Sequence, residues 1–370
     1  MIGLSRRCRP LAALACGAMA IVAPPLAAQV ENPQSQESIH VKPFDLPADS
    51  ELLSAETRAG IARRKALFAQ GYAICTPKTT MTGKEIRACE ALAYAPILAE
   101  VRKFYDVKIE AATIAGIPTE IVTPSSGISP ANRYRVLINV HGGGFVFGAR
   151  VVGELEAMPI AASGKYRVVA VDYRLAPDHH FPAASEDVVA VYQDLLKSYA
   201  PSEIGFYGCS AGGWIIGQSM SLIAKRKLPK PGAIAIQCAP PLSLGGDSNV
   251  IAAALDGVPP HKPSLTEFYF QGVSPTDPMA YPADFDEQLK HFPPTLTMTS
   301  TRDIEMSPSL IMHYRLTRLG VPAELQVFEG LRHGEYVLNP YIPETRVATK
   351  MVTDFFDRWL SRPGKRNARR

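Results

Sequence analysis

Short apolar runs and amphipathic stretches alternate along the chain from about residue 107 onward. The apolar runs have the length of strands and predict strands at 107–109, 120–122, 135–140, 168–171, 203–207, 233–236, 296–299 and 324–328. Between the later runs, apolar residues recur with helical spacing and predict helices at 184–198, 214–224, 308–319 and 344–360. The first two strands are expected to form a hairpin that turns at Gly116. This alternation predicts an α/β fold with a mostly parallel central sheet flanked by helices.

Helical patterns also precede the first strand, within residues 48–105. The first helix is expected to be capped by Asp49 or Ser50, and a second helix follows it. A further addition is expected at about 240–275, in a long stretch rich in Pro and Gly that holds two short helical pieces. The sequence therefore predicts a core at 106–362 that carries a cap made of the N-terminal helices and this insertion.

The N-terminus has the pattern of a secretory signal over residues 1–28. Three arginines precede an apolar run at 11–23, and small residues follow it up to Ala28. We expect cleavage after Ala28 and a mature protein in the periplasm or outside the cell. The apolar run is shorter than the roughly 20 residues that a membrane-spanning helix needs, and no later run reaches that length. Residues 29–47 are predicted to be a linker and residues 363–370 a solvated basic tail.

The charge of the chain argues against a nucleic-acid partner. The 370 residues carry a formal net charge of +4, and the predicted signal holds three arginines and no acidic residue. Its removal lowers the net charge to +1. A nearly neutral protein has no electrostatic footprint for a polyanion, so we expect a small-molecule partner instead. The composition says nothing about the oligomeric state.

Four cysteines remain after the predicted cleavage: Cys75, Cys89, Cys209 and Cys238. Cys75 and Cys89 belong to one helical region, and export to an oxidising compartment makes them the expected disulfide pair. The alternative, four buried free thiols, stays open at this point. The sequence contains no Cys-x-x-Cys pair and no Cys/His cluster with zinc spacing, so neither a metal nor another cofactor is expected.

The sequence GCSAG at 208–212 lies between a predicted strand and a predicted helix. A tight strand-turn-helix of this kind needs small neighbours and places its central residue, Ser210, at the edge of the sheet. There the serine oxygen lies at a helix N-terminus, whose free N–H groups stabilise a developing negative charge. The alternative is an ordinary Gly-rich turn. The pattern favours a nucleophile at Ser210.

A serine hydroxyl needs a base to take its proton and an acid to orient that base. His333 follows the last predicted strand, and Asp303 follows the strand before it. Both are therefore expected at the same sheet edge as Ser210, and the order Ser, Asp, His is that of α/β hydrolases. The alternatives are a surface loop histidine and a helix cap. Glu305 is the second candidate for the acid.

The sequence HGGG at 141–144 directly follows another predicted strand. Successive glycines expose backbone N–H groups without side-chain obstruction, which suits an oxyanion hole. A phosphate-binding loop is the alternative, but the pattern is neither a G-x-G-x-x-G nor a Walker lysine motif. His141 is expected to support the loop by hydrogen bonding rather than to act as a base.

Together, HGGG at 141–144, YRLAP at 173–177, FPAA at 181–184 and GCSAGG at 208–213 resemble the hormone-sensitive lipase family of esterases. The resemblance covers most of residues 105–360 and implies an α/β-hydrolase core with a helical cap. It also implies site residues: nucleophile Ser210, base His333, acid Asp303, and oxyanion donors at the N–H groups of Gly143, Gly144 and Ala211.

Two positions near the nucleophile depart from the family pattern. Cys209 stands where an acidic residue is common, and Trp214 stands where an asparagine is common. The resemblance implies a serine carboxylesterase that cleaves short-chain, small or lactone esters through an acyl-enzyme and needs no cofactor. Two other functions remain open: a small-molecule binding protein on the same fold, and a hydrolase of small amides.

Overall fold

The computed structural model describes residues 45, 47–78, 80–255 and 266–361. The predicted signal, nearly all of the predicted linker, the middle of the predicted insertion and the predicted basic tail lie outside the described residues. All described helices and strands belong to one compact unit, residues 46–370. In this described part of the chain, no helix combines the length and the apolar character that crossing a membrane requires.

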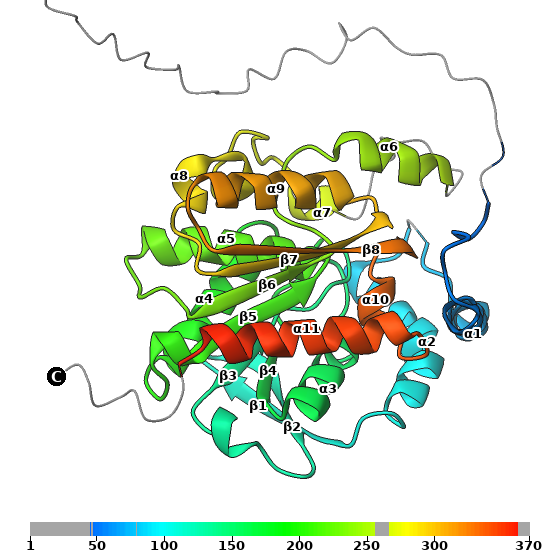
Figure 1. Cartoon of the computed structure of the whole chain (residues 1–370), viewed down its shortest axis with the longest axis horizontal. Coiled ribbons are helices and arrows are strands. Elements are labelled where there is room, and N and C mark those ends of the chain that lie inside the picture. The colour runs from blue at the N-terminus through cyan, green and yellow to red at the C-terminus, as the bar shows by residue number, and fades with distance from the viewer. Residues whose placement is uncertain (1–44, 46, 79, 256–265, 362–370) are drawn as a thin grey trace, which may run out of the picture. The chain divides into compact units, whose positions relative to one another are not determined.

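Eight strands form one sheet in the described part of the chain, in the order β1-β2-β4-β3-β5-β6-β7-β8 (Figure 1). The hairpin β1–β2 is antiparallel, β2 pairs antiparallel with β4, and every other pair is parallel. The predicted mostly parallel sheet is confirmed. The strands are β1 (Val107–Ile114), β2 (Ile117–Pro124), β3 (Val136–Asn139), β4 (Arg167–Val171), β5 (Ile204–Cys209), β6 (Ala233–Gln237), β7 (Thr295–Arg302) and β8 (Ala323–Arg332).

The central strands are buried on both faces, as their nearly continuous apolar runs predict. Every residue of β3, β5 and β6 is buried. Successive side chains point to opposite faces of the sheet, so Phe206 joins one apolar core and Tyr207 the other. Burial on two faces requires helices on both sides, which is the layer arrangement of a parallel α/β sheet.

The flanking helices complete these two cores. Helices α4 (Ala183–Leu195), α5 (Ala211–Lys225) and α9 (Met306–Arg318) contribute to the core that holds Phe206. Helices α3 (Val152–Gly164) and α11 (Pro343–Trp359) contribute to the core that holds Tyr207. Figure 1 shows α5 and α9 on one side of the sheet and α11 on the other.

The two N-terminal helices are α1 (Ala55–Ile74) and α2 (Gly83–Val101), which pack against each other. Ser54 caps α1, so the predicted cap at Asp49 or Ser50 is wrong; the Ser50 hydroxyl instead donates to Glu329. Thr82 begins α2 with a capping box. A disulfide joins Cys75 and Cys89 just beyond α1 and within α2, which confirms the expected pair.

The insertion after β6 holds α6 (Gly246–Leu255), α7 (Thr266–Tyr269), η4 (Pro282–Asp284) and α8 (Asp286–Leu289). Tyr269 stacks face to face on Phe145, with ring centroids 4.6 Å apart, and Phe270 contacts the same ring edge-on. The insertion therefore packs directly on the glycine-rich loop after β3. Trp214, from α5, contacts both Phe145 and Phe270 and belongs to this aromatic group. Other short elements are η2 (Pro130–Asn132), η3 (Pro201–Glu203) and α10 (Glu335–Leu338).

The carboxyl ends of β3, β5, β7 and β8 meet at one edge of the sheet because these strands are parallel. The loops that follow them, together with Ala211 at the start of α5, contain the candidate catalytic and oxyanion residues found in the sequence. The pairing of β7 with β8 shifts register between Ser300 and Arg302, immediately before Asp303. Such an irregularity redirects a strand end and is common beside active sites.

Candidate active site

Ser210 lies in the turn between β5 and α5, with φ 57° and ψ −125°. A non-glycine residue with positive φ is strained and persists only where its surroundings hold it. The flanking positions must be glycine because there is no room for a side chain. A Cβ would lie 2.0 Å from the Val140 carbonyl oxygen at Gly208 and 1.8 Å from it at Gly212. The sharp turn expected from the GCSAG sequence is therefore present, and the end of β3 presses against it.

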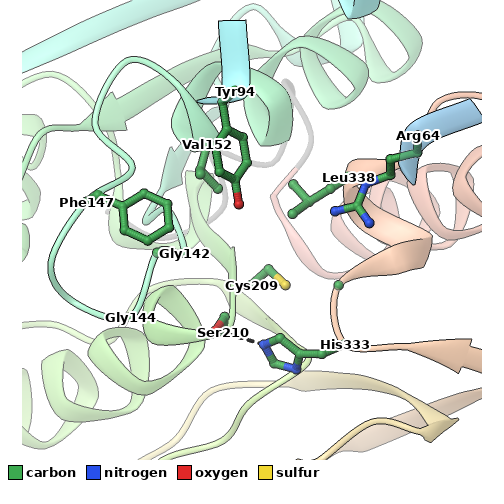
Figure 2. A pocket seen from close by; sticks show the side chains of 12 residues that line it. Arg64, Tyr94, Gly142, Gly144, Phe147, Val152, Cys209, Ser210, His333 and Leu338 are labelled. Atoms are coloured by element: carbon green, nitrogen blue, oxygen red, sulfur yellow. Dashed lines mark hydrogen bonds between the residues drawn. The ribbon is translucent and has the colours of Figure 1, made fainter. Parts of the chain in front are cut away.

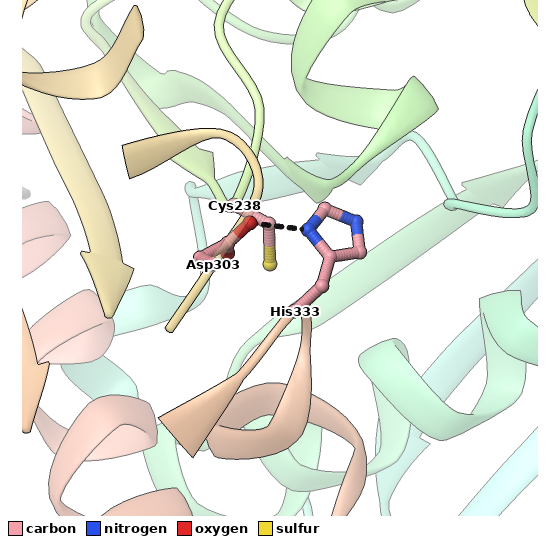
Figure 3. A group of neighbouring side chains, drawn as sticks. All are labelled: Cys238, Asp303 and His333. Carbon is pink, nitrogen blue, oxygen red and sulfur yellow. Dashed lines mark hydrogen bonds and ion pairs between the residues drawn. The ribbon is translucent and has the colours of Figure 1, made fainter. Parts of the chain in front are cut away.

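The structure brings Ser210, His333 and Asp303 together in one chain of hydrogen bonds. His333 Nε2 lies 2.9 Å from Ser210 Oγ (Figure 2), and His333 Nδ1 lies 2.7 Å from Asp303 Oδ1 (Figure 3). A carboxylate only accepts, so Nδ1–H donates to Asp303 and Nε2 is left to accept from the serine hydroxyl. This tautomer is the one in which a histidine can act as the base for a serine.

The electrostatic surroundings of His333 favour its protonated form. Burial lowers its pKa, but the charge and hydrogen bond of Asp303, together with the charge of Glu305, outweigh burial and leave the pKa above its ordinary value. Asp303 is fully buried, whereas the His333 side chain is 30 % exposed on the pocket side. The pair can therefore hold a proton that leaves the serine.

Glu305 does not take the position of the acid. The structure gives its carboxylate no hydrogen bond to His333, whereas its backbone N–H donates to Asp303 Oδ1 at 2.9 Å. Burial raises the pKa of Glu305 to about 7; His333 opposes this rise and Asp303 adds to it. The geometry thus favours Asp303 over the second candidate, and Glu305 acts on the pair through its charge and its backbone.

The glycine-rich loop after β3 lies beside the serine. Gly143 has φ 119°, and its carbonyl accepts from the N–H groups of Val146 and Phe147, which closes a tight turn. Among the described residues, the N–H groups of Gly143, Gly144 and Ala211 have no acceptor within the protein. Gly143 and Gly144 line the same pocket as Ser210. Three unpaired donors at this place suit a negatively charged oxygen.

His141 supports this loop, as expected from the sequence. Its ring stacks on Tyr173 with centroids 4.3 Å apart, and its Nδ1–H donates to the Gly142 carbonyl at 2.7 Å. The Tyr173 hydroxyl donates to the His141 carbonyl at 2.7 Å. Burial lowers the pKa of His141 to about 4, so the ring is neutral near pH 7. This explains the tyrosine of the YRLAP sequence: its hydrogen bond to His141 stabilises the end of the strand that leads into the loop.

Glu156, from α3, is a buried carboxyl group that the sequence reading missed. Its Oε1 accepts from the Gly142 N–H at 3.0 Å and its Oε2 from Asn139 Nδ2 at 2.8 Å. Burial raises its pKa to about 8, while bonds from Gly142, Asn139 and the Cys209 backbone oppose the rise. Glu156 thus joins the glycine loop to the strand that carries the serine. Helix α3 was not predicted because it is buried on nearly every side and shows no amphipathic period.

A second disulfide, Cys209–Cys238, lies beside the serine and was not expected from the sequence. It ties the end of β5 to the residue after β6, where Cys238 adopts φ 70°. Figure 3 shows Cys238 next to the Asp303–His333 pair, and the donor atoms of the three residues lie within 4.8 Å of one another. The sulfur is committed to the disulfide and His333 to its two partners. These residues therefore do not fit a metal ion.

A cavity of about 210 Å³ opens above Ser210 and His333. Its walls include Phe147 from the glycine loop, Arg64 from α1 and Tyr94 from α2 (Figure 2). The helices expected to form a cap therefore contribute side chains to the pocket. Neither Arg64 nor Tyr94 carried any signal in the sequence.

Comparisons with known proteins agree with this geometry. A protein-family model described as the alpha/beta hydrolase fold matches residues 137–337. An esterase of Acinetobacter venetianus is 25% identical over 254 residues, which cover 67% of this chain and 82% of that protein. An acetyl-hydrolase of Streptomyces hygroscopicus is 26% identical over 263 residues, which cover 68% of this chain and 87% of that protein.

Solved structures are similar over a larger part of the chain. Esterase E25 has a TM-score of 0.75 at 29% identity, over 88% of this chain and 99% of that one. An esterase from the bacterial hormone-sensitive lipase family has a TM-score of 0.69 at 24% identity, over 84% of this chain and 99% of that one, and supports the fold. The α/β-hydrolase fold expected from the motifs is confirmed, and the chain belongs to the α/β-hydrolase family.

Proposed function

We propose that this protein hydrolyses small carboxylic esters with Ser210 as the nucleophile. The observation that carries the proposal is the unbroken hydrogen-bond chain from Ser210 Oγ through His333 to Asp303. The similar proteins named esterase and acetyl-hydrolase support the same reaction class. The cavity of about 210 Å³ supports small or short-chain substrates, lactones among them, over long acyl chains.

In the first half of the reaction, Ser210 Oγ attacks the ester carbonyl while its proton moves to His333 Nε2. The raised pKa of His333 means that Asp303 stabilises the imidazolium that forms. The carbonyl oxygen gains negative charge and accepts hydrogen bonds from the N–H groups of Gly143, Gly144 and Ala211. His333 then gives its proton to the departing alcohol, and the acyl group remains on the serine.

In the second half, water attacks the acyl-serine and His333 Nε2 takes the proton of that water. The second tetrahedral intermediate uses the same three N–H groups. Its collapse releases the carboxylic acid, and the proton returns from His333 to Ser210 Oγ. Every proton transfer is thus assigned to an atom that the described site already holds, and no cofactor takes part.

The proposal includes export of the protein. Residues 1–28 have the pattern of a secretory signal, and the two disulfides, Cys75–Cys89 and Cys209–Cys238, suit an oxidising compartment. We expect the mature chain in the periplasm or the medium, with Gln29 as its first residue. N-terminal sequencing of the protein from these fractions tests this. A chain that keeps Met1 and stays with the cytoplasm would contradict it.

The test of the activity is hydrolysis of p-nitrophenyl esters of increasing acyl length by the mature protein, with Ser210→Ala as the control. We expect turnover that falls with acyl length and disappears in the variant. Labelling of Ser210 by a fluorophosphonate tests the nucleophile without a substrate. A folded protein that neither turns over any ester nor reacts with the fluorophosphonate would instead favour a binding protein. Turnover of small amides and not of esters would favour the amidase.

A further inference from the structure

The pocket above the serine contains a partly unsatisfied arginine. Arg64 is 15 % exposed, and its Nη1 donates to Glu335 Oε2 at 2.8 Å. Its Nη2 has no hydrogen-bond partner among the described residues and is not among the buried atoms, whereas its Nε–H is buried without a partner. The guanidinium also lies over the Phe68 ring, with its central carbon 4.7 Å from the centroid. Figure 2 shows the guanidinium directed toward the cavity above Cys209.

The opposite wall of the cavity carries a second donor. Tyr94 points its hydroxyl into the cavity (Figure 2), and the structure gives this hydroxyl no hydrogen-bond partner among the described residues. Its ring packs edge-on against Phe68, with centroids 4.7 Å apart, and at a tilt against Phe147, with centroids 5.8 Å apart. Burial raises the pKa of Tyr94 to about 12, so the hydroxyl keeps its proton and can donate.

These two donors are placed for the same ligand group. Arg64 and Tyr94 line the same cavity, and the charge of Arg64 lowers the pKa of Tyr94 against the effect of burial. Phe68 contacts both side chains. Glu335 begins α10 two residues after His333, so its ion pair anchors Arg64 next to the base. The Nη2 group of Arg64 and the hydroxyl of Tyr94 have no acceptor among the described residues, and a ligand in the cavity that brings an acceptor can bind both.

We propose that the esterase prefers esters that carry a free carboxylate close to the ester bond, and that Arg64 and Tyr94 bind this carboxylate. The inference rests on the proposed function. A planar guanidinium matches a carboxylate better than any neutral group, and charge-assisted bonds are roughly twice as strong as neutral ones. A cavity of about 210 Å³ admits monoesters of short dicarboxylic acids. An entirely apolar acyl chain would leave both donors unpaired.

The test compares pairs of methyl esters that differ in charge and hardly in shape. Methyl hydrogen succinate carries the carboxylate, and methyl succinamate replaces it by an amide. Malonate and glutarate pairs vary the reach, and proton release at pH 8 measures turnover while the carboxylate is fully ionised. In at least one pair, we expect kcat/KM of the charged ester to exceed that of its amide at least tenfold.

The variant must remove the cation without leaving a buried charge. Arg64→Gln alone would strand Glu335, which is 7 % exposed, so the test uses Arg64→Gln with Glu335→Gln. Two facing amides can still hydrogen-bond each other, and position 335 can still accept from Asn339, as Glu335 Oε1 does now. Arg63→Gln is the matched control: Arg63 is the neighbouring residue on α1, 58 % exposed and paired with Glu100 away from the cavity.

We expect the charged-to-amide ratio of kcat/KM to fall to about one in the double variant and to stay at the wild-type value in Arg63→Gln. Tyr94→Phe should lower the ratio less than the double variant, because it removes one neutral donor. A wild-type ratio near or below one at every chain length would overturn the inference while leaving the esterase intact. A ratio that survives the double variant would also overturn it.

Binding separates this inference from the catalytic proposal. Calorimetry with the inactive Ser210→Ala variant measures affinity for the charged ester and for its amide without turnover. Preference for the charged ester, lost with Arg64→Gln and Glu335→Gln, supports the inference even if no ester is ever cleaved. Equal affinity for both ligands would contradict it. Failure of the proposed function would appear separately, as absent turnover and an unreactive Ser210.

Discussion

Replacing Asp303 and Glu305 by their amides separates the acid of the site from its charged neighbour. Asp303 Oδ1 accepts both from His333 Nδ1 and from the Glu305 N–H, so an amide oxygen can occupy this position in Asp303→Asn. The amide nitrogen would then take the place of Oδ2, which is buried and has no hydrogen-bond partner among the described residues. The tautomer of His333 survives in this arrangement, and the negative charge is lost.

The size of the effect follows from that lost charge. An adjacent opposite charge shifts a pKa by about 1–3 units, and each unit corresponds to about 1.4 kcal/mol, or tenfold in rate. We therefore expect Asp303→Asn to lower kcat/KM by about 10- to 1000-fold. A loss near 10,000-fold would mean that the amide has turned and imposed the wrong tautomer. Glu305→Gln keeps the backbone bond to Asp303 and should cost less than about tenfold.

The pH dependence gives a second readout. Only neutral His333 can accept the serine proton, so activity falls as the pH is lowered through its pKa. That pKa lies above its ordinary value, so the acid limb of kcat/KM should lie above about pH 6.5. Asp303 and Glu305 both raise the pKa of His333, so both variants should move the limb to lower pH, and Asp303→Asn should move it further.

The assay is kcat/KM for p-nitrophenyl acetate between pH 5 and pH 9, with circular dichroism to show that each variant is folded. The reasoning is refuted if Asp303→Asn keeps wild-type turnover while Glu305→Gln abolishes it. That result would make Glu305 the acid. A limb that moves to higher pH in either folded variant would refute the electrostatic argument by itself.

Further predictions concern the disulfides and the elbow. Denatured mature protein should show no free thiol before reduction. Removing Cys209–Cys238 as a double Ala variant should lower the free energy of unfolding by about 3–4 kcal/mol, because this disulfide closes a loop over a sequence separation of 29 residues. Removing Cys75–Cys89, over a separation of 14 residues, should lower it by about 3 kcal/mol. Denaturant unfolding measures both losses. Equal stability of both variants and wild type would contradict this. Gly212→Ala places a Cβ 1.8 Å from a backbone oxygen. The resulting displacement of Ser210 should lower kcat about 100-fold. A variant with the kcat of the wild type would contradict the argument that this position has no room for a side chain.

The sequence predicted most of the sheet because its central strands are buried on both faces. Such strands appear as apolar runs without alternation, as in β5 and β6, and their ends were predicted to within a few residues. Helix α3 was not predicted, for the same physical reason. It is buried along most of its length, so no polar face marks its period, and its internal Pro159 reads as a helix breaker.

The candidate catalytic residues were predictable because each follows a strand end, and Ser210 and His333 also lie beside glycines. Ser210, Asp303 and His333 come together through topology, and topology follows from the strand pattern. Arg64 and Tyr94 were not predictable, since they reach the pocket from helices whose packing on the core leaves no local pattern. A polar residue on such a helix looks like any solvated position until the helix is placed.

Cys209 shows both what could and what could not be predicted from the sequence. In the sequence it is a departure from the family pattern, where an acid is common before the nucleophile. In the structure, Cys209 joins Cys238 in a disulfide, and a buried carboxyl group at the same turn comes from Glu156, which contacts the backbone of Gly142 and of Cys209. A covalent tie and a carboxyl from another helix thus both hold the turn. Residues that stabilise one turn from two different elements cannot be identified from either element alone, because each looks unremarkable in its own segment.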